Sequence, residues 1–568
     1  MKRVVVLRKY IPEALLSMVV IFELFFRLGR FALIGDDSTY AFRAVNLVDF
    51  MFSGRQTTPW QWFNPLPWWV DLSFHDAPPL FFWLEHLSFR IFGVSSLVAV
   101  ILPAVAGCVS AIIVYLIVRQ VLGRQRALVA VVFLLCLNPF IWLQRLALLE
   151  SVMMPLILLC WYGYLKAEQD KRWYWLVGAA GGLALLTKYS AIFLILAILI
   201  HLTWKRKADW HSPHWWRAVI GGLIILSPVL LYNYFLWLTR GHFDVQLAAV
   251  FGQSNADWPI LNTRVNWDIF SSVSRLMFTS AALYSWPLLI LMVWALYRLV
   301  HYHYRQHTVS SNSWFHIILG LSWLVTIVLT KTDDRFVVTG YLLVLLIICT
   351  SLPSRFFRLP LALTRYSAAV IIIMLFSWLY MINTNYAARP WGIVNITYSD
   401  SRRETYGFDQ VERIINSSFR QRKPVVVLED QFTISFDPMK SAERRYDPQT
   451  IALATNEQEA APIIIYDRNT NWFTSLWYFY RWSFYHGQTV LSTQEASSLL
   501  SDPSGEFLQA VKGRQFILFM TTDYSLRDQP KYQSAPFPAI SELQQKTSMT
   551  YIFDAYGQPV WEVYRGSF

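Results

Sequence analysis

The stretch "IPEALLSMVVIFELFFRLGRFALIGDDSTY", residues 11–40, is strongly hydrophobic up to Ile34 and then reaches two adjacent carboxylates, Asp36 and Asp37. An apolar run of about 20 residues is long enough to cross the hydrocarbon layer of a membrane as a helix. The run has no small-residue cleavage site and many similar runs follow it, so we predict a retained span and not a signal peptide. The two acids would then lie at the mouth of a membrane helix.

The composition of the whole chain supports a membrane protein with many spans. Of its 568 residues, 55% are hydrophobic and 15% are charged, whereas a soluble globular protein carries about 25% charged residues. The cysteines all fall inside apolar runs without metal-like spacing, so we expect free, buried thiols instead of a disulfide framework or a zinc site. These are Cys108, Cys136, Cys160 and Cys349.

The net charge of +12 could suggest a nucleic-acid partner, but its distribution argues against one. Lysine and arginine cluster in short segments between the apolar runs, which is the positive-inside pattern of cytoplasmic loops. These segments are 1–9, 119–126, 166–172, 205–217 and 355–365.

Placing the basic segments in the cytoplasm predicts about eleven spans, starting from a cytoplasmic N-terminus. An odd number of crossings would leave the C-terminal tail outside. Residues 173–187 and 189–204 would form a hairpin whose tip, at "LLTKYSA", faces outward. The predicted spans are 11–34, 94–118, 127–143, 151–166, 173–187, 189–204, 217–238, 276–299, 314–330, 336–352 and 364–383.

Many ionisable side chains would then lie on the outer side, and an ionisable residue in or beside a span suggests function. The outer loop 35–93 also alternates tryptophan with proline over residues 57–74, which favours short interfacial helices. Such helices could simply hold the loop at the surface, or could lie beside a lipid-linked substrate.

The tail after about residue 385 alternates strand-like and helix-compatible segments, which predicts a small α/β domain over 386–568. No glycine-rich phosphate loop follows its predicted strands. Its aromatic stretch 471–487 is expected to pack against the membrane domain or the bilayer surface, in preference to binding sugar. The predicted strands are 424–430, 462–467, 515–521 and 550–557, with helices within 408–423 and 493–513.

Four stretches in a fixed order resemble a known family. They are "GDDSTYAFRAVN" (35–46), "HDAPPLFFWLEHLSFRIFG" (75–93), "QRLALLESVMMPLILLCWYGYLKA" (144–167) and "GGLALLTKYSAIFLI" (181–195). Over roughly residues 10–350 the chain resembles the dolichyl-phosphate-mannose/protein mannosyltransferase-like superfamily of C-type glycosyltransferases (GT-C), which includes the bacterial lipid A aminoarabinose transferases.

The resemblance implies a mainly α, polytopic GT-C fold over 1–385, followed by an extracytoplasmic α/β domain. It also implies an inner-membrane glycosyltransferase that moves a sugar, with inversion, from a polyprenyl-phosphate donor to a glycan, lipid or protein acceptor outside the cytoplasm. The alternatives are a transporter or flippase for lipid-linked glycans, which would need polar residues near mid-span and repeated halves, and an inactive relative that serves as a scaffold.

The resemblance also implies roles for individual residues. Asp36 aligns with the first acid of the family motif and would be the general base. Asp37 would hold a metal or orient the acceptor, and Glu150 would help to bind the acceptor or a cation. The leaving lipid phosphate needs cationic or hydrogen-bonding partners; the outward-facing candidates are Lys188, Arg145, Arg264, Arg275, Arg335 and Tyr341.

Three of these positions also have simpler explanations. Glu150 could pair with Arg145, Lys188 could extend its ammonium to the interface, and Arg335 could pair with the adjacent Asp333 or Asp334.

One position departs from the family pattern. Many relatives have lysine or histidine immediately before the Pro-Pro pair, where this chain has Ala77. The preceding His75 and Asp76 could instead join Asp37, or Asp36, in a site for a divalent cation such as Mg²⁺ or Mn²⁺.

Overall fold

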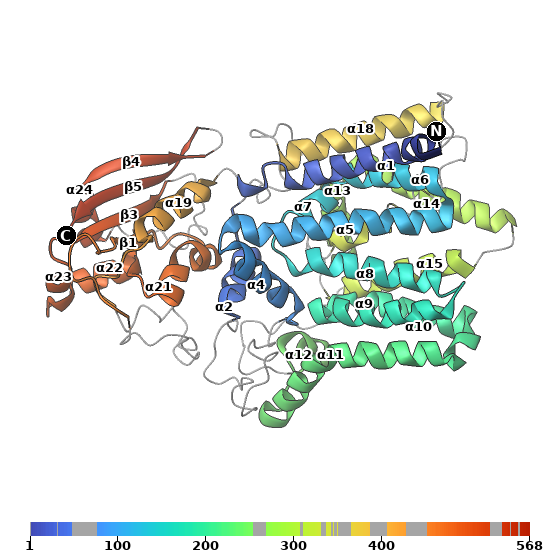
Figure 1. Cartoon of the computed structure of the whole chain (residues 1–568), viewed down its shortest axis with the longest axis horizontal. Helices are drawn as coiled ribbons and strands as arrows, with labels where there is room; N and C mark the ends of the chain where they lie inside the picture. The colour runs from blue at the N-terminus through green and yellow to red at the C-terminus, as the bar shows by residue number, and fades with distance from the viewer. Residues whose placement is uncertain are drawn as a thin grey trace. The chain divides into compact units, whose positions relative to one another are not determined.

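The computed structural model gives the fold in two parts, a bundle of long helices and a small α/β domain (Figure 1). The residues that it describes are 2–30, 32–47, 77–253, 269–306, 311–330, 337–341, 343, 345, 349, 365–386, 406–427, 451–522, 537–545, 547–554 and 557–568.

Most predicted spans coincide with a helix of the bundle, although α1 ends at Phe25, short of the predicted end at residue 34, and the predicted span 336–352 lies partly outside the described residues. The helices are α1 (Lys2–Phe25), α4 (Leu80–Phe92), α5 (Ser96–Leu122), α6 (Arg124–Leu135), α7 (Asn138–Leu143), α8 (Leu149–Lys166), α9 (Tyr174–Thr187), α10 (Ile192–Lys205), α11 (Pro213–Arg240), α12 (Val245–Phe251), α13 (Ile269–Tyr284), α14 (Trp286–Gln306), α15 (Ser311–Thr330) and α18 (Arg365–Asn385).

Two predicted spans are wrong as single helices, because a proline begins a new helix inside each of them. The span 127–143 is divided into α6 and α7, with Pro139 in the first turn of α7. The span 276–299 is divided into α13 and α14 at Ser285, whose φ is 69°, and Pro287 follows in the first turn of α14. Proline has no N–H to donate and disfavours helical backbone in the preceding residue, so a continuous helix is interrupted there.

The hairpin predicted for residues 173–204 is present as α9 and α10. Its two basic ends meet at the buried Asp209, which accepts hydrogen bonds from Lys171, Arg206 and the Tyr174 hydroxyl. Burial alone would raise the pKa of the Asp209 carboxyl, but these hydrogen bonds and the nearby cationic charges lower it overall. Lys188 therefore lies at the opposite end of the hairpin from the basic loops.

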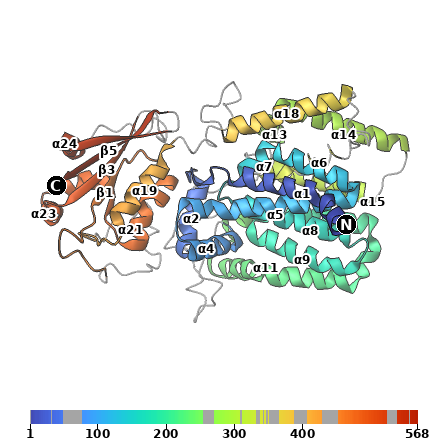
Figure 2. The same ribbon diagram turned by 45° about the horizontal axis from the view of Figure 1, so that its top comes forward.

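Helix α9 lies side by side with α8 and α11, as both views of the ribbon show (Figures 1 and 2). Glycines permit the close approach of α9 to α11: a Cβ on Gly178 would lie 2.0 Å from the carbonyl oxygen of Ala218, and one on Gly182 would lie 2.9 Å from that of Gly222. Small residues at such contacts are typical of helix packing in membranes.

Three of the described helices are long and apolar enough to span a membrane by themselves, at Ser96–Leu122, Pro213–Leu238 and Ala368–Asn385. Shorter apolar helices occur at Tyr189–Lys205, Trp286–Arg298 and Trp314–Leu329. These helices make the chain an integral membrane protein, while the number of its spans stays a prediction.

The chain divides into two compact units. One contains 1–28, 59–93 and 98–401, and the other contains 29–58, 94–97 and 402–568. The second unit thus takes in the short helix α2 (Asp36–Asn46), whereas the sequence analysis places residues 35–93 with the membrane domain and begins the α/β domain at 386.

The α/β domain is built on a five-stranded sheet in the order β2-β1-β3-β5-β4. The first three strands are parallel, and β5 and β4 continue the sheet in antiparallel register. The strands are β1 (Ile463–Tyr466), β2 (Val490–Ser492), β3 (Gln515–Thr521), β4 (Ser548–Phe553) and β5 (Pro559–Ser567), and the helices are α19 (Phe408–Phe419), α20 (Trp472–Ser475), α21 (Arg481–His486), α22 (Thr493–Leu500), α23 (Glu506–Val511) and α24 (Pro538–Gln545).

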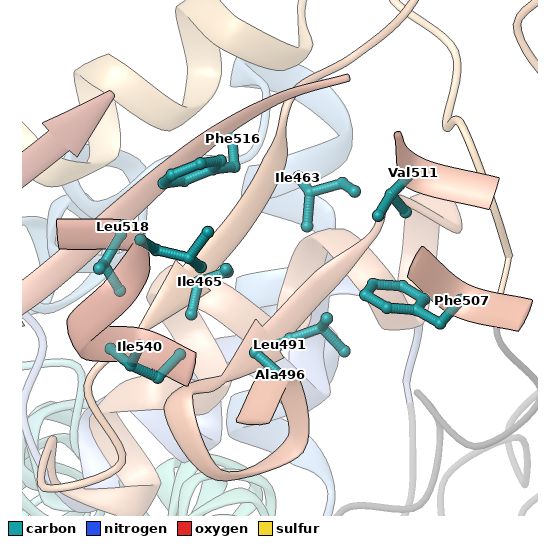
Figure 3. Packing of buried hydrophobic residues seen from close by; sticks show 10 residues of the cluster. Ile463, Ile465, Leu491, Ala496, Phe507, Val511, Phe516, Leu518 and Ile540 are labelled. Carbon is teal, nitrogen blue, oxygen red and sulfur yellow. The ribbon is translucent and has the colours of Figure 1, made fainter. Parts of the chain in front are cut away.

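One face of this sheet packs against α22, α23 and α24. Successive side chains of a strand point to opposite faces, so Ile463 and Ile465 of β1 join Phe516 and Leu518 of β3 on the face shown in Figure 3. The helices contribute Ala496, Phe507, Val511, Ile540 and Leu543 to the same cluster.

The opposite face packs against the aromatic segment Trp472–His486, which is formed by α20, a π-helical turn (Leu476–Tyr480) and α21. The rings of Tyr466 and Phe479 stack with centroids 4.4 Å apart, and Phe519 and Trp561 also contact Phe479. The aromatic stretch is therefore a packing element, as expected, but inside the α/β unit.

The predicted fold class, a mainly α polytopic chain with a C-terminal α/β domain, is confirmed. The strand predicted at 424–430 is not found over its described residues 424–427. The preceding residue, Lys423, forms an isolated bridge to Ala460. The sequence analysis also missed β2 and β5.

Candidate active site

The two acids Asp36 and Asp37 begin helix α2. The preceding Gly35 has φ 72° and ψ −134°, a backbone conformation that favours glycine, and it lets the chain turn sharply into the helix. Both carboxylates lie in the first turn, where the helix dipole and the unpaired backbone N–H groups favour negative charge.

The structure distinguishes the two acids. Asp37 is fully buried, and its Oδ1 accepts the backbone N–H groups of Ile34 at 2.8 Å and Ser38 at 3.1 Å. The carboxylate thus folds back across Gly35 and fixes the turn. Asp36 is half-buried and stays accessible at the start of the helix.

In the helical unit, Glu150 at the start of α8 and Lys188 at the tip of the α9–α10 hairpin form a buried ion pair. Their side chains are 0% and 5% exposed. The partner of Glu150 is therefore Lys188, and not the Arg145 that its sequence neighbourhood suggests. Glu150 Oε2 has no hydrogen-bond partner among the described residues.

The residue next to Lys188 belongs to a second buried cluster, which the sequence analysis missed. The Tyr189 hydroxyl donates to Asp244 at 2.6 Å, and the Asn233 amide donates to the same carboxylate at 2.8 Å. Asp244 also accepts the backbone N–H groups of Gln246 and Leu247 at the start of α12. Burial raises the pKa of Asp244 to about 6. An aspartate directly before a helix is the local signal that could have indicated this cap.

Arg145 stabilises the end of helix α1. Its Nη1 donates to the carbonyl of Glu23 at 2.9 Å and its Nη2 to that of Phe26 at 2.8 Å, and its guanidinium lies over the ring of Tyr386. These contacts give Arg145 a helix-capping role. Its predicted contact with a lipid phosphate stays a prediction.

Of the remaining predicted phosphate contacts, two lie among the described residues. Tyr341 is fully buried, with its ring against Phe140 at 5.5 Å, and Arg275 is exposed on α13. Arg264 and Arg335 lie outside the described residues.

The predicted metal site is only partly described. His75 and Asp76, the other two predicted ligands, lie outside the described residues. Over the described ranges, no group of three or more histidine, cysteine, aspartate or glutamate side chains is arranged to hold a metal ion.

A family model matches part of the chain. Residues 76–232 match the family model described as dolichyl-phosphate-mannose-protein mannosyltransferase. The predicted resemblance is thereby confirmed for the part of the chain that carries α4 to α11.

Two curated relatives match over short segments. An uncharacterised protein of Aquifex aeolicus (strain VF5) is 28% identical over 165 residues, which cover 28% of this chain and 33% of that protein. Protein O-mannosyl-transferase 1 of Danio rerio is 29% identical over 153 residues, which cover 24% of this chain and 21% of that protein. The chain thus spans a third or less of the length of these relatives.

Solved structures of similar shape cover most of the chain at low sequence identity. The crystal structure of ArnT from Cupriavidus metallidurans bound to undecaprenyl phosphate matches with a TM-score of 0.48 and 13% identity, covering 97% of both chains. The crystal structure of the Archaeoglobus fulgidus oligosaccharyltransferase in complex with Zn and sulfate matches with a TM-score of 0.40 and 12% identity, covering 89% of this chain and 67% of that chain.

Proposed function

We propose that this chain, whose residues 76–232 match the dolichyl-phosphate-mannose-protein mannosyltransferase model, is an integral-membrane glycosyltransferase. It transfers a sugar from a polyprenyl-phosphate donor to an acceptor on the extracytoplasmic face. The observation that supports this proposal most directly is the start of α2, where a fixed Asp37 leaves the neighbouring Asp36 accessible in a helix N-terminal turn.

In the proposed reaction Asp36 is the general base. An acceptor hydroxyl attacks the anomeric carbon of the donor, and its proton passes to the Asp36 carboxylate. The new bond joins the acceptor oxygen to the anomeric carbon, while the bond from that carbon to the phosphate oxygen breaks. The lipid phosphate leaves with the bonding electrons, and attack from the opposite side inverts the anomeric centre.

Lys188 is the candidate for stabilising the leaving phosphate, because it is a buried cation at the tip of the α9–α10 hairpin. Glu150 holds its ammonium group in place. In this proposal Glu150 therefore acts on the phosphate through Lys188, in addition to the acceptor or cation contact inferred from the sequence.

A divalent cation at Asp37, His75 and Asp76 belongs to the same proposal. Carboxylate and imidazole groups are suitable ligands for Mg²⁺ or Mn²⁺. One oxygen of Asp37 accepts two backbone N–H groups. If the cation is required, EDTA abolishes transfer and added Mn²⁺ restores it.

The test of the proposed function is the substitution Asp36→Asn in the full-length protein, assayed in membranes with polyprenyl-phosphate [¹⁴C]mannose, [¹⁴C]glucose or [¹⁴C]4-amino-arabinose. Transfer is followed as loss of label from the polyprenyl-phosphate donor, separated from products by thin-layer chromatography. Because a positioned base contributes about 10²–10⁴-fold to rate, we expect Asp36→Asn to reduce transfer at least a hundredfold.

The matched control is Asp409→Asn, since Asp409 also lies in the first turn of a helix, α19, but pairs with Arg413 on the surface. Its transfer rate should equal that of the wild type. Full transfer by stably expressed Asp36→Asn would refute the assignment of the base. Absence of transfer by the wild type with every donor would favour the flippase or scaffold alternatives.

A further inference from the structure

The α/β domain lies outside the four family-like stretches, yet its aromatic segment makes direct contact with helix α2. The segment Trp472–His486 contacts the sheet on one side through Phe479, which stacks on Tyr466. On its other side it contacts α2: the ring of Phe42 lies 5.5 Å from that of Phe484 and 5.1 Å from that of Tyr485. The segment therefore connects a rigid sheet to the helix that begins with the two acids.

Two tyrosine hydroxyls fix the backbone of this helix. The Tyr478 hydroxyl accepts the backbone N–H of Leu33 at 2.9 Å, three residues before Asp36. The Tyr485 hydroxyl donates to the carbonyl of Phe42 at 2.5 Å, six residues after Asp36. Both hydrogen bonds end on backbone atoms, so they hold the path of the chain whatever side chains it carries.

The two hydrogen bonds enclose the turn that presents the acids. Leu33 is held by Tyr478, Ile34 by the Asp37 carboxylate, and Gly35 turns the chain into α2. The position of Asp36 is thus set from the domain side by Tyr478 and from the helix side by Tyr485.

The anchor itself is rigid. Tyr478 is buried, and its ring stacks on Phe408 with centroids 4.3 Å apart. Next to it, the Trp477 indole donates to Ser96 at 2.8 Å, and Ser96 donates to Glu412, which pairs with Arg481. Side chains locked by packing and hydrogen bonds can hold a reacting group to within the few tenths of an ångström that catalysis requires.

We propose that the α/β domain is a positioning element of the active site, and that Tyr478 and Tyr485 are positioning residues that align Asp36 for proton abstraction. This inference rests on the proposed function, because it takes Asp36 to be the base. It gives a role to a domain that the family resemblance does not cover.

The test uses the full-length protein with Tyr478→Phe, Tyr485→Phe and the double substitution, each of which removes a hydroxyl and keeps the ring. The matched control is Tyr480→Phe, because Tyr480 lies in the same segment, is equally buried and directs its hydroxyl to Glu495 instead of α2. Transfer is measured with the labelled donors named above.

We expect each single substitution to lower kcat severalfold and the double substitution to lower it tenfold or more, with the donor KM changed less than twofold. An interaction that acts only on the transition state lowers kcat and kcat/KM together. Partial unfolding of the variant would instead reduce the amount of active enzyme and leave α2 unchanged in the molecules that stay folded. Tyr480→Phe should keep wild-type kcat.

A second measurement keeps the inference independent of activity. Amide hydrogen exchange of residues 33–46 should become at least tenfold faster in the double variant and stay unchanged in Tyr480→Phe. Unchanged amide exchange in the double variant would overturn the positioning role. So would an unchanged kcat in the double variant, provided that the wild-type protein transfers sugar. If exchange is faster in the double variant but the wild-type protein transfers no sugar, the two tyrosines do fix α2 and only the proposed function is rejected.

Discussion

At the scale of single residues, the structure separates acids that look equivalent in the sequence. Asp36 and Asp37 are adjacent, but Asp36 is half-buried, whereas Asp37 is fully buried and one of its carboxylate oxygens accepts backbone N–H groups on both sides of Gly35. Asp37→Ala would therefore disturb the turn itself, because it removes the accepting oxygen. Asp36→Asn instead tests chemistry. This difference makes Asp36 the more informative substitution.

The pH dependence of stability should show the titration of Asp244. Its pKa is raised by burial to about 6 from the ordinary 3.8, so the native state holds a proton that the unfolded state has lost between about pH 4 and 6. Its contribution to the free energy of unfolding is therefore largest below pH 4 and is lost as the pH rises through about 6. The loss is on the order of 3 kcal/mol, at about 1.4 kcal/mol per pKa unit.

The measurement is the thermal midpoint of the detergent-purified protein from pH 4 to 7, expressed as the difference between wild type and Asp244→Asn. This difference should fall with rising pH and become constant above pH 6. Tyr189→Phe keeps the titrating carboxyl and should retain the pH step. A difference that does not vary with pH would contradict the assignment.

The buried pair of Glu150 and Lys188 should behave as one unit. Removing one member leaves an uncompensated buried charge, which costs about 3–5 kcal/mol. We expect Lys188→Met and Glu150→Gln each to destabilise the protein strongly, and the double variant to cost much less than their sum. A double-mutant cycle on chemical unfolding measures this coupling.

The exposed pair of Asp409 and Arg413 provides the comparison. The Arg413 side chain is 72% exposed, and exposed pairs contribute about 1 kcal/mol or less. A coupling for Glu150 and Lys188 that is as small as that of the surface pair would show that Lys188 has its main partner elsewhere.

At the scale of elements, local signals placed the helices well and their ends less well. Prolines at 139 and 287 begin new helices inside apolar runs that hydropathy alone joins together. Apolar periodicity reports burial, while the interruption comes from the missing N–H of proline. Strand β5 was missed, although its sequence "PVWEVYRGS" alternates apolar with polar or charged residues, which is typical of a half-buried strand.

The contact between α9 and α11 should be sensitive to any added side chain. A methyl group at Gly178 would lie 2.0 Å from a backbone oxygen, which cannot move without displacing helix α11. We expect Gly178→Ala to destabilise the protein by about 1–3 kcal/mol, measured as a lower thermal midpoint in detergent.

Gly221 is the control for this substitution. It lies on α11 itself, and a Cβ there would meet nothing within 4 Å. Gly221→Ala should be neutral or slightly stabilising, because glycine within a helix costs about 0.5–1 kcal/mol relative to alanine. Equal effects of the two substitutions would argue against the close α9–α11 contact.

At the scale of the whole molecule, the predicted orientation can be tested by labelling introduced cysteines. The native cysteines are buried, apart from the half-buried Cys108 within α5. Gln509→Cys on α23 should react with a membrane-impermeant maleimide in intact spheroplasts, because we predict that the α/β domain is outside. Gln169→Cys and Lys207→Cys, in the basic loops, should react only after lysis.

All three positions are exposed in the structure, so a lack of reaction reports the membrane barrier and not burial. If Lys207→Cys is labelled in intact spheroplasts and Gln509→Cys is protected, the predicted topology is wrong and the opposite orientation holds.

The sequence by itself determined that this protein folds in a membrane, and it determined the order of its main elements. Long apolar runs, basic loops and four ordered motifs are local features, and a helix in hydrocarbon satisfies its backbone hydrogen bonds within its own segment. For the same reason the α9–α10 hairpin could be placed from local patterns. The two acids were predicted at the end of the first span, whereas the structure ends α1 at Phe25 and places them at the start of the separate helix α2.

Only the tertiary structure decided which side chains meet. Tyr478 contacts Leu33 across 445 positions of sequence, and Glu150 chooses Lys188 over the nearer Arg145. Such pairs depend on packing between distant segments, and no local pattern records them. The same holds for the membership of α2 in the α/β unit, which turns an apparently separate C-terminal domain into a support for the proposed catalytic acid.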